Sequence, residues 1–173
     1  ENYVLNDTPQ TVVLEAEQIK TVTFTNELKK GQIKVIKVDQ DNNEVKLKGI
    51  EFKIYDEDKN LVDTLITDEN GEATSKRLRI DKKYIVQESK TLENYVLNET
   101  PQTVTLTQDQ ITDITFTNEL KKGQIKVIKV DLDNKEVKLK GVEFKVYDED
   151  NNLVDTLITD ENGEATSKRL RID

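Results

Sequence analysis

The chain repeats itself with a period of 92 residues, and this repeat limits the folds that are open to it. Residues 31–81 return as residues 123–173, and the two copies differ at only five positions. A shorter segment, residues 1–6, returns with the same offset at residues 93–98. The period is too long for a short solenoid repeat, and it suits a small domain that folds independently.

The phase of the repeat divides the chain into three parts. Residues 1–29 correspond to the C-terminal part of one repeat, residues 30–121 to a complete repeat, and residues 122–173 to the N-terminal part of the next. The junction at residues 120–123 is very short, so the last strand of one repeat runs almost directly into the first strand of the next. This predicts a stiff array of domains without long linkers.

Within the complete repeat, short segments of alternating apolar and polar residues predict β-strands. The predicted strands are residues 33–38, 50–55, 61–67, 84–88, 95–97, 104–106 and 111–117. The dipeptide Asn70-Gly71 is a strong signal for a hairpin turn after the third strand. Only residues 14–20 and 106–111 have room for a helical turn. Seven or more short strands with regular turns predict an all-β sandwich.

Composition excludes several classes of function. The formal net charge is -9, which argues against nucleic acid as a partner because phosphates repel an acidic surface. Cysteine and histidine are absent, so a Cys nucleophile, a Ser-His-Asp triad and disulfides are excluded, and a zinc site has none of its usual ligands. We expect no cofactor, and no apolar run within this segment is long enough to insert into a membrane.

One acidic segment has part of a calcium-loop pattern. Asp39, Asp41 and Asn43 have the spacing with which such a loop begins, but the glycine and the closing glutamate are missing. We interpret this segment as an acidic turn and predict no metal site. The adjacent acids at 57–58 and 68–69 are interpreted as solvated turn residues, and the basic residues 76–79 as part of a strand.

Three strands carry a polar residue where an apolar one is expected. Side chains alternate between the two faces of a strand, and in each case two apolar residues on one face are followed there by a polar one. The triplets are Ile33-Val35-Lys37, Tyr84-Val86-Glu88 and Ile114-Phe116-Asn118. The assignment of Lys37 has an alternative, because Ile36 and Val38 are also apolar and Lys37 would then be a solvated charge.

If Lys37, Glu88 and Asn118 meet in the core, they can form a covalent cross-link. Burial favours the neutral forms of an amine and of a carboxyl group, and a neutral amine is a nucleophile. The Lys37 amine can attack the side-chain amide of Asn118 while Glu88 polarises that amide and transfers protons. Ammonia leaves and an isopeptide bond remains. The reaction occurs once, since both reactants are consumed.

The order of several motifs resembles a known family. They are residues 35–39, 47–54, 67–71, 84–88, 94–97 and 115–118. This order is similar to that in the B-type repeat domains of Gram-positive collagen adhesins and pilins, the CnaB family, which includes SpaA-like pilin domains. The resemblance covers the whole period. The family often has a proline and a glycine before the loop tyrosine, whereas this chain has Thr91-Leu92-Glu93-Asn94.

The resemblance implies a fold and a set of site residues. It implies tandem Greek-key β-sandwiches of the prealbumin-like or immunoglobulin-like type. It also implies that Lys37 and Asn118 form an isopeptide bond for which Glu88 is the catalytic residue. The departure at residues 91–94 affects a loop and leaves these three residues in place.

We expect a structural function outside the cell. Stapled repeats suit a stalk or fibre of a surface adhesin or pilus-like protein of a Gram-positive bacterium, not an enzyme with external substrates. Targeting and anchoring segments, and any domain that binds a host matrix ligand, are expected outside these residues. The alternative is a binding module whose loops contact host matrix or another surface protein. Near-identity of the copies favours the stalk, because a spacer needs copies and not diversity.

The two partial repeats carry equivalents of the site residues. Asn26 corresponds to Asn118, and Lys129 corresponds to Lys37. We expect head-to-tail contacts with adjacent repeats or with other copies of the chain, in which Lys129 lies near Asn26 of the neighbour. Such a pair lacks the counterpart of residues 82–92, which include Glu88. The alternative is that the chain is an excerpt from a longer continuous array.

Overall fold

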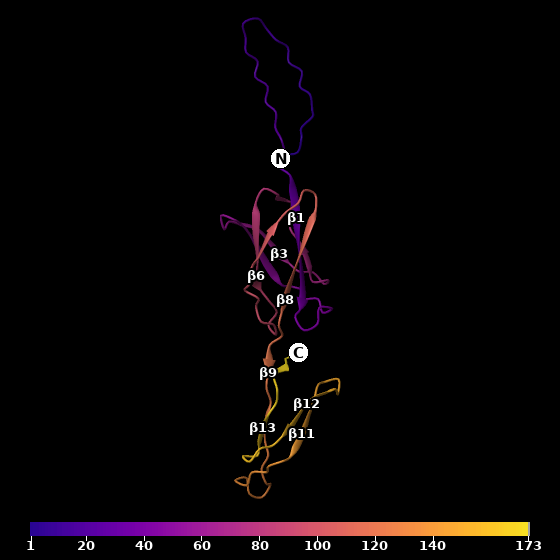
Figure 1. The fold of residues 1–173 in the computed structure, drawn as a ribbon, viewed down its shortest axis with the longest axis vertical. Coiled ribbons are helices and arrows are strands. Elements are labelled where there is room, and N and C mark those ends of the chain that lie inside the picture. The colour runs from indigo at the N-terminus through magenta and orange to yellow at the C-terminus, as the bar shows by residue number, and fades with distance from the viewer. Residues whose placement is uncertain (173) are drawn as a thin grey trace. The chain divides into compact units, whose positions relative to one another are not determined.

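The computed structural model describes residues 1–172, which form fourteen β-strands and no helix (Figure 1). This confirms the prediction of an all-β protein. The chain divides into two compact units, with residues 1–119 in the first and the following residues in the second. None of the described residues forms a helix long and apolar enough to cross a lipid bilayer.

The complete repeat is a sandwich of two four-stranded sheets. In the first sheet, the central strand pairs antiparallel with two short strands and parallel with the last strand of the repeat. These strands are β1 (Lys30–Asp39), β4 (Glu72–Thr74), β5 (Leu78–Arg79) and β8 (Ile111–Asn118). The second sheet has the order β3 (Leu61–Ile66), β2 (Glu51–Asp56), β6 (Lys83–Lys90) and β7 (Gln102–Thr105).

The core lies between these two sheets. β2 alternates throughout and β1 alternates as far as Lys37, so every second side chain is buried there, and the last two residues of β1 are buried as well. Ile33 and Val35 from the first sheet face Phe52 and Val86 from the second, and all four are fully buried. The rings of Phe52 and Phe116 pack against each other with their centroids 4.9 Å apart. This packing fixes the distance between the two sheets next to the buried polar residues of the candidate site.

The Asn70-Gly71 turn does not form a hairpin, contrary to the prediction. β3 pairs with β2, whereas β4 pairs with β1 in the opposite sheet, so the turn carries the chain across the sandwich. The turn chemistry reverses the chain correctly, and Gly71 has the expected positive φ of 68°. Burial of the two strand faces decides the pairing partner, which a local turn signal does not contain.

The predicted strand at residues 95–97 is absent. Tyr95 is nevertheless buried, because it projects from a loop and donates its hydroxyl hydrogen to Asp39 at 2.8 Å. Its backbone pairs only as an isolated bridge, and Val96 N donates to Glu119 O at 2.9 Å, so the segment is held by the buried Tyr95 side chain and a short backbone contact and not by a full strand. The possible helical turns at residues 14–20 and 106–111 are not helices.

The second unit repeats the pairing of the first five strands and contains no counterpart of β6, β7 or β8. Its pairs are β10 with β13, β11 with β12, and β9 with β14. The strands are β9 (Lys122–Gly123), β10 (Lys126–Ile128), β11 (Glu143–Tyr147), β12 (Leu153–Ile158), β13 (Glu164–Thr166) and β14 (Leu170–Arg171). Apolar side chains that are buried in the complete repeat are therefore open here, as Ile125 is at 44% exposure.

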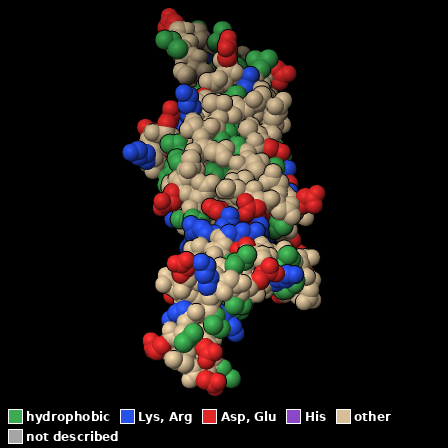
Figure 2. All heavy atoms as spheres, turned by 60° about the horizontal axis from the view of Figure 1, so that its bottom comes forward, with side chains coloured by type: hydrophobic (Ala, Val, Ile, Leu, Met, Phe, Trp, Pro, Cys, Tyr) green, Lys and Arg blue, Asp and Glu red, His purple; other side chains and the backbone are tan. Residues whose placement is uncertain are grey.

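Residues 1–28 contain no strand, although an isolated bridge joins Tyr3 to Leu28. Their apolar side chains Leu14, Ile19 and Phe24 are exposed. On the face drawn in Figure 2, acidic and basic side chains are interspersed and hydrophobic side chains form only small groups. This pattern agrees with the charged, acidic composition.

Candidate functional site

Lys37 lies in the core of the sandwich, near the end of β1. Its backbone N–H donates to Gly71 O at 2.7 Å, and its carbonyl accepts from Leu47 N at 3.0 Å. A Cβ on Gly71 would lie 2.4 Å from the Lys37 carbonyl oxygen, so only glycine permits this approach. The side chain of Lys37 is fully buried, with Nζ 5.9 Å and 6.0 Å from the ring centroids of Phe52 and Phe116.

The structure brings Glu88 and Asn118 to the Lys37 amine. Glu88 projects from β6 opposite Phe52, and Asn118 ends β8 opposite Asp39. Lys37 Nζ lies 2.7 Å from Glu88 Oε2 and donates a short hydrogen bond to Asn118 Oδ1. Asn118 Nδ2 donates to Glu88 Oε1 at 2.6 Å. The three side chains therefore form a closed ring, and residues 37, 88 and 118 come from three different strands.

The site is almost dry. Glu88 and Asn118 are 2% and 1% exposed, and Lys37 is not exposed at all. Burial in this apolar surrounding lowers the pKa of Lys37, although the neighbouring Glu88 opposes the shift. Glu88 Oε2 approaches the amine closely, but the two atoms are not aligned as a hydrogen bond. A buried charge without full hydrogen bonding is costly, so burial favours the neutral form of the Lys37 amine.

A fourth residue, Thr91, contacts the ring. Asn118 Nδ2 donates to Thr91 Oγ1 at 2.6 Å, in addition to its bond with Glu88. In the sequence, Thr91 is distinguished only as part of a loop that departs from the family pattern. The sequence feature that could have indicated its role is its position, because it is a hydroxyl residue directly after the strand that carries Glu88.

The partial calcium-loop pattern begins with a residue of the core. Asp39 is fully buried; its Oδ2 accepts from Tyr95, and its Oδ1 accepts from the backbone N–H groups of Asp41 and Asn42 at 2.7 Å and 3.0 Å. These bonds close the acidic turn after β1. Among the described residues, no group of three or more Asp or Glu side chains is arranged to hold a metal ion.

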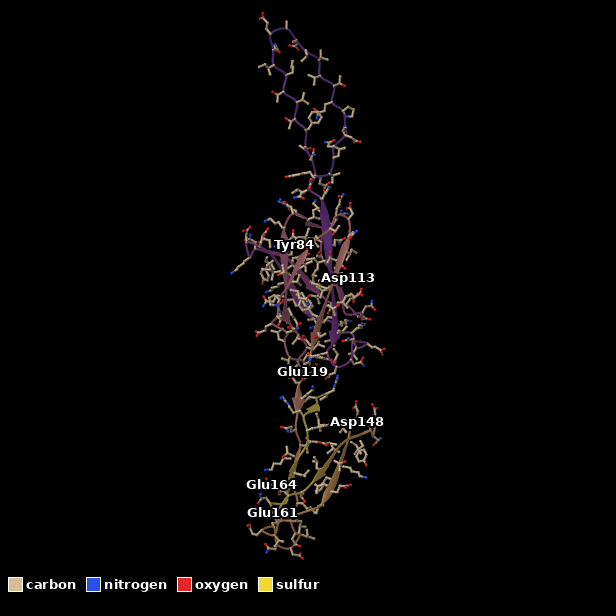
Figure 3. The ribbon with its side chains drawn as sticks, viewed as in Figure 1. Tyr84, Asp113, Glu119, Asp148, Glu161 and Glu164 are labelled. Atoms are coloured by element: carbon tan, nitrogen blue, oxygen red, sulfur yellow. The ribbon has the colours of Figure 1, made fainter. Side chains whose placement is uncertain are left out.

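Other acidic residues lie apart from one another. Asp148 in the second unit caps its own turn, and it lies well away from Glu161 and Glu164 (Figure 3). Glu161 pairs with the exposed Lys140 at 2.7 Å. The basic residue Arg77 pairs with Asp109 on the surface of the first unit. The acidic contacts match the interpretation of solvated turn charges, whereas only the second half of the basic segment 76–79 lies in a strand, β5.

The equivalents of the site residues lie in different surroundings. Asn26 is exposed, and Lys129 is half-exposed. The backbone of Lys129 is nevertheless held as that of Lys37 is, by a 2.7 Å hydrogen bond to Gly163 O. The first partial repeat thus contains only the asparagine of the ring. The second contains only the lysine, whose backbone has the same hydrogen bond as in the complete repeat.

Comparison with known families identifies the repeat. The family model of the SpaA prealbumin-like fold domain matches residues 31–120 and 123–173. The chain belongs to this family. Its members have the prealbumin-like fold that the resemblance predicted, and the two matched segments of this SpaA-type chain correspond to the complete repeat and the second unit. A comparison with curated proteins finds no match.

Solved structures share the fold of this SpaA-type chain. The Bacillus anthracis TIE protein is 27% identical with a TM-score of 0.76, and the match covers 98% of this chain. The chain spans 32% of the length of that protein. BcpA, the major pilin subunit of Bacillus cereus, is 17% identical with a TM-score of 0.55, over 80% of this chain and 53% of BcpA. The likeness to BcpA concerns the fold alone.

Proposed function

We propose that this chain is a structural segment of a surface stalk or fibre, and that an isopeptide bond between Lys37 and Asn118 cross-links its complete repeat. The observation that carries this proposal is the closed, buried ring of Lys37, Glu88 and Asn118. An amine with a lowered pKa lies against an amide, and a carboxyl group contacts both reacting nitrogens.

The reaction follows from these contacts. Lys37 transfers a proton to Glu88 Oε2, and the neutral amine attacks Asn118 Cγ. A new C–N bond forms and the tetrahedral centre then expels Nδ2, which takes a proton from Glu88 Oε1 and leaves as ammonia. Nζ gives its second proton to Glu88 as the amide forms, so Glu88 ends as the neutral acid that it was when the amine attacked. Fixed proximity in a dry core supplies much of the acceleration. The chain turns over no external substrate.

The position of the bond suits a stalk that bears tension. β1 and β8 run parallel, with Asp39 beside Asn118, so the bond joins the end of the first strand to the end of the last. Tension that enters at the start of β1 leaves after Asn118. It therefore follows β1 and the covalent bond, and it bypasses residues 38–117. Because the cross-link is an amide and not a disulfide, reducing agents leave it intact.

Adjacent repeats or other copies of the chain are the proposed partners. Residues 19–26 are the repeat equivalent of β8, which pairs with β1 in the complete repeat. Residues 19–26 of one copy therefore fit the open edge of β10 in the next, head to tail, with Asn26 near Lys129. Such a contact does not close and extends into a fibre. A bond between Lys129 and Asn26 would also need a counterpart of β6, the strand that supplies Glu88 and lies between β2 and β7.

The proposed location is the outer surface of a Gram-positive bacterium. The chain shares its fold with a major pilin subunit of Bacillus cereus. Nearly the whole of this chain also matches part of a Bacillus anthracis protein. A surface fibre also suits the chain's acidic charge and its cysteine-free composition, because the isopeptide bond replaces the disulfides that often brace extracellular domains.

Tryptic mapping tests the proposal directly. An acylated Lys37 is not cleaved, so the digest should contain residues 35–46 joined to residues 91–121. The Glu88→Ala variant should instead release residues 35–37, 38–46 and 91–121 as separate peptides. Fragmentation of the joined species should place the link on Lys37 and Asn118. Separate peptides from the unmodified chain would refute the cross-link.

A further inference from the structure

Asn118 Nδ2 is the atom that leaves as ammonia in the proposed reaction, and the structure gives it two acceptors. One hydrogen points to Glu88 Oε1 and the other to Thr91 Oγ1, each at 2.6 Å. Both donors of the amide group are therefore satisfied inside a nearly dry site. Thr91 lies just after β6, which ends at Lys90, so the strand that supplies Glu88 also places the hydroxyl.

We infer that Thr91 positions the leaving nitrogen and sets the rate of bond formation. This inference rests on the proposed function. The two hydrogen bonds of Nδ2 fix the plane of the Asn118 amide, and they turn Oδ1 and Cγ toward the Lys37 amine. Without the hydroxyl, one buried N–H group would lack an acceptor, which is unfavourable, and the amide would rotate to relieve it. The Cγ atom would then spend less time in line with Nζ.

The hydroxyl also suits the change that occurs at Nδ2 during the reaction. The nitrogen of a planar amide donates hydrogen bonds and accepts none, whereas the nitrogen of the tetrahedral intermediate carries a basic lone pair. A threonine hydroxyl can accept before this change and donate after it. An interaction that strengthens along the reaction accelerates it. Thr91 keeps its own proton throughout, because Glu88 carries the proton that passes from Nζ to Nδ2.

Thr91 also marks the side on which ammonia leaves. Lys37, Glu88 and Asn118 are buried, whereas Thr91 is half-buried and reaches solvent. Nδ2 lies against its hydroxyl. We therefore expect ammonia to leave on the side of Thr91, and its dilution into water would make the last step effectively irreversible.

The test compares Thr91→Val, which has the same shape without a hydroxyl, with Thr91→Ser, which keeps it. Each protein is made by cell-free translation, synthesis is stopped, and samples are acid-quenched at intervals for intact mass. We expect Thr91→Val to lose ammonia about tenfold more slowly than the unmodified chain, as fits the loss of one hydrogen bond. Thr91→Ser should react at close to the unmodified rate.

A second pair of variants separates positioning from folding. Glu88→Ala does not react, so its melting temperature with and without Thr91→Val reports the contribution of Thr91 to the fold alone. We expect Thr91→Val to lower the melting temperature only slightly, as the loss of one hydrogen bond would, and to leave the chain folded at the assay temperature. The inference is overturned if Thr91→Val reacts at the unmodified rate, if Thr91→Ser is as slow as Thr91→Val, or if Thr91→Val leaves the Glu88→Ala chain unfolded at the assay temperature. If the unmodified chain never loses ammonia, the proposed function itself is wrong.

Discussion

Residues 31–81 and 123–173 are two nearly identical copies of one sequence in two different surroundings. The backbone around the lysine is the same in both: Lys37 N and Lys129 N each donate to a glycine carbonyl at 2.7 Å. The side chains differ, since Lys37 is fully buried and Lys129 is half-exposed. Local sequence therefore places the lysine backbone, and strands from elsewhere in the repeat create its chemistry.

The strands that make the difference are β6 and β8. They supply Glu88 and Asn118, and they also cover the ring of Phe52, which is fully buried, whereas its equivalent Phe144 is half-buried. The lowered pKa of Lys37 arises from burial and so depends on the same long-range pairing. In the proposed reaction, Lys37 therefore becomes reactive only when the last strand has docked.

The largest expected effect comes from Lys37→Met, compared with Lys129→Met. Removal of the cross-link should lower the free energy of unfolding of the complete repeat by about 4–5 kcal/mol on the chain-entropy model. Lys129→Met should leave it unchanged, because Lys129 has no counterpart of β6 or β8 beside it. Denaturant unfolding of both variants measures the difference. Equal destabilisation by the two substitutions would remove the distinction between the copies.

Gly71→Ala and Gly163→Ala test the part that the copies share. Each alanine Cβ would lie 2.4 Å from the carbonyl oxygen of the neighbouring lysine, and each glycine has a positive φ. We expect a local loss of about 1–3 kcal/mol in both copies, because the strain is the same. Amide hydrogen exchange at Lys37 and Lys129 measures it. A loss confined to one copy would show that the turn geometry depends on the distant strands.

Tyr95→Phe and Tyr3→Phe compare two equivalent tyrosines. Tyr95 is buried and donates to Asp39, whereas Tyr3 is 53% exposed. Loss of the buried hydrogen bond should cost about 1 kcal/mol, and Tyr3→Phe should have no measurable effect. Thermal unfolding of the first unit checks both. If Tyr95→Phe proves as harmless as Tyr3→Phe, the Asp39 contact contributes nothing to stability.

The smallest expected effect is a pH dependence in a chain that cannot react. In Asn118→Ala, Lys37 stays free, and burial keeps its folded-state pKa below the ordinary lysine value of 10.5. The folded state then binds fewer protons than the unfolded state between these two pKa values. Stability should therefore be full above 10.5 and fall as the pH falls through the folded pKa. The double variant with Lys37→Met should lack this dependence, and an identical pH profile in both would contradict it.

Much of the fold could be predicted from alternation of apolar residues. For the strands that contain Ile33, Phe52 and Val86, most of the predicted ends lie within two residues of the observed ends. The same alternation indicated that the side chains of Lys37, Glu88 and Asn118 point into the core. The structure buries all three. A period-two pattern carries this information because the faces of a strand are strictly alternate.

The remaining features depend on contacts between distant segments. Gly71 was recognised as a turn residue, but its contact with the Lys37 carbonyl and the crossing between sheets depend on packing. Thr91 lies in a loop without periodicity, so only the structure places its hydroxyl against Asn118. Tyr95 was assigned to a predicted strand because the sequence pattern of a short apolar segment does not distinguish a paired strand from a loop with one buried side chain.

The intact mass of the folded chain tests the central claim most directly. We expect a mass lower than that of the sequence by one ammonia, from Lys37 and Asn118. Glu88→Ala should have the full mass expected for its sequence. An unmodified chain at the full mass of its sequence would contradict the cross-link.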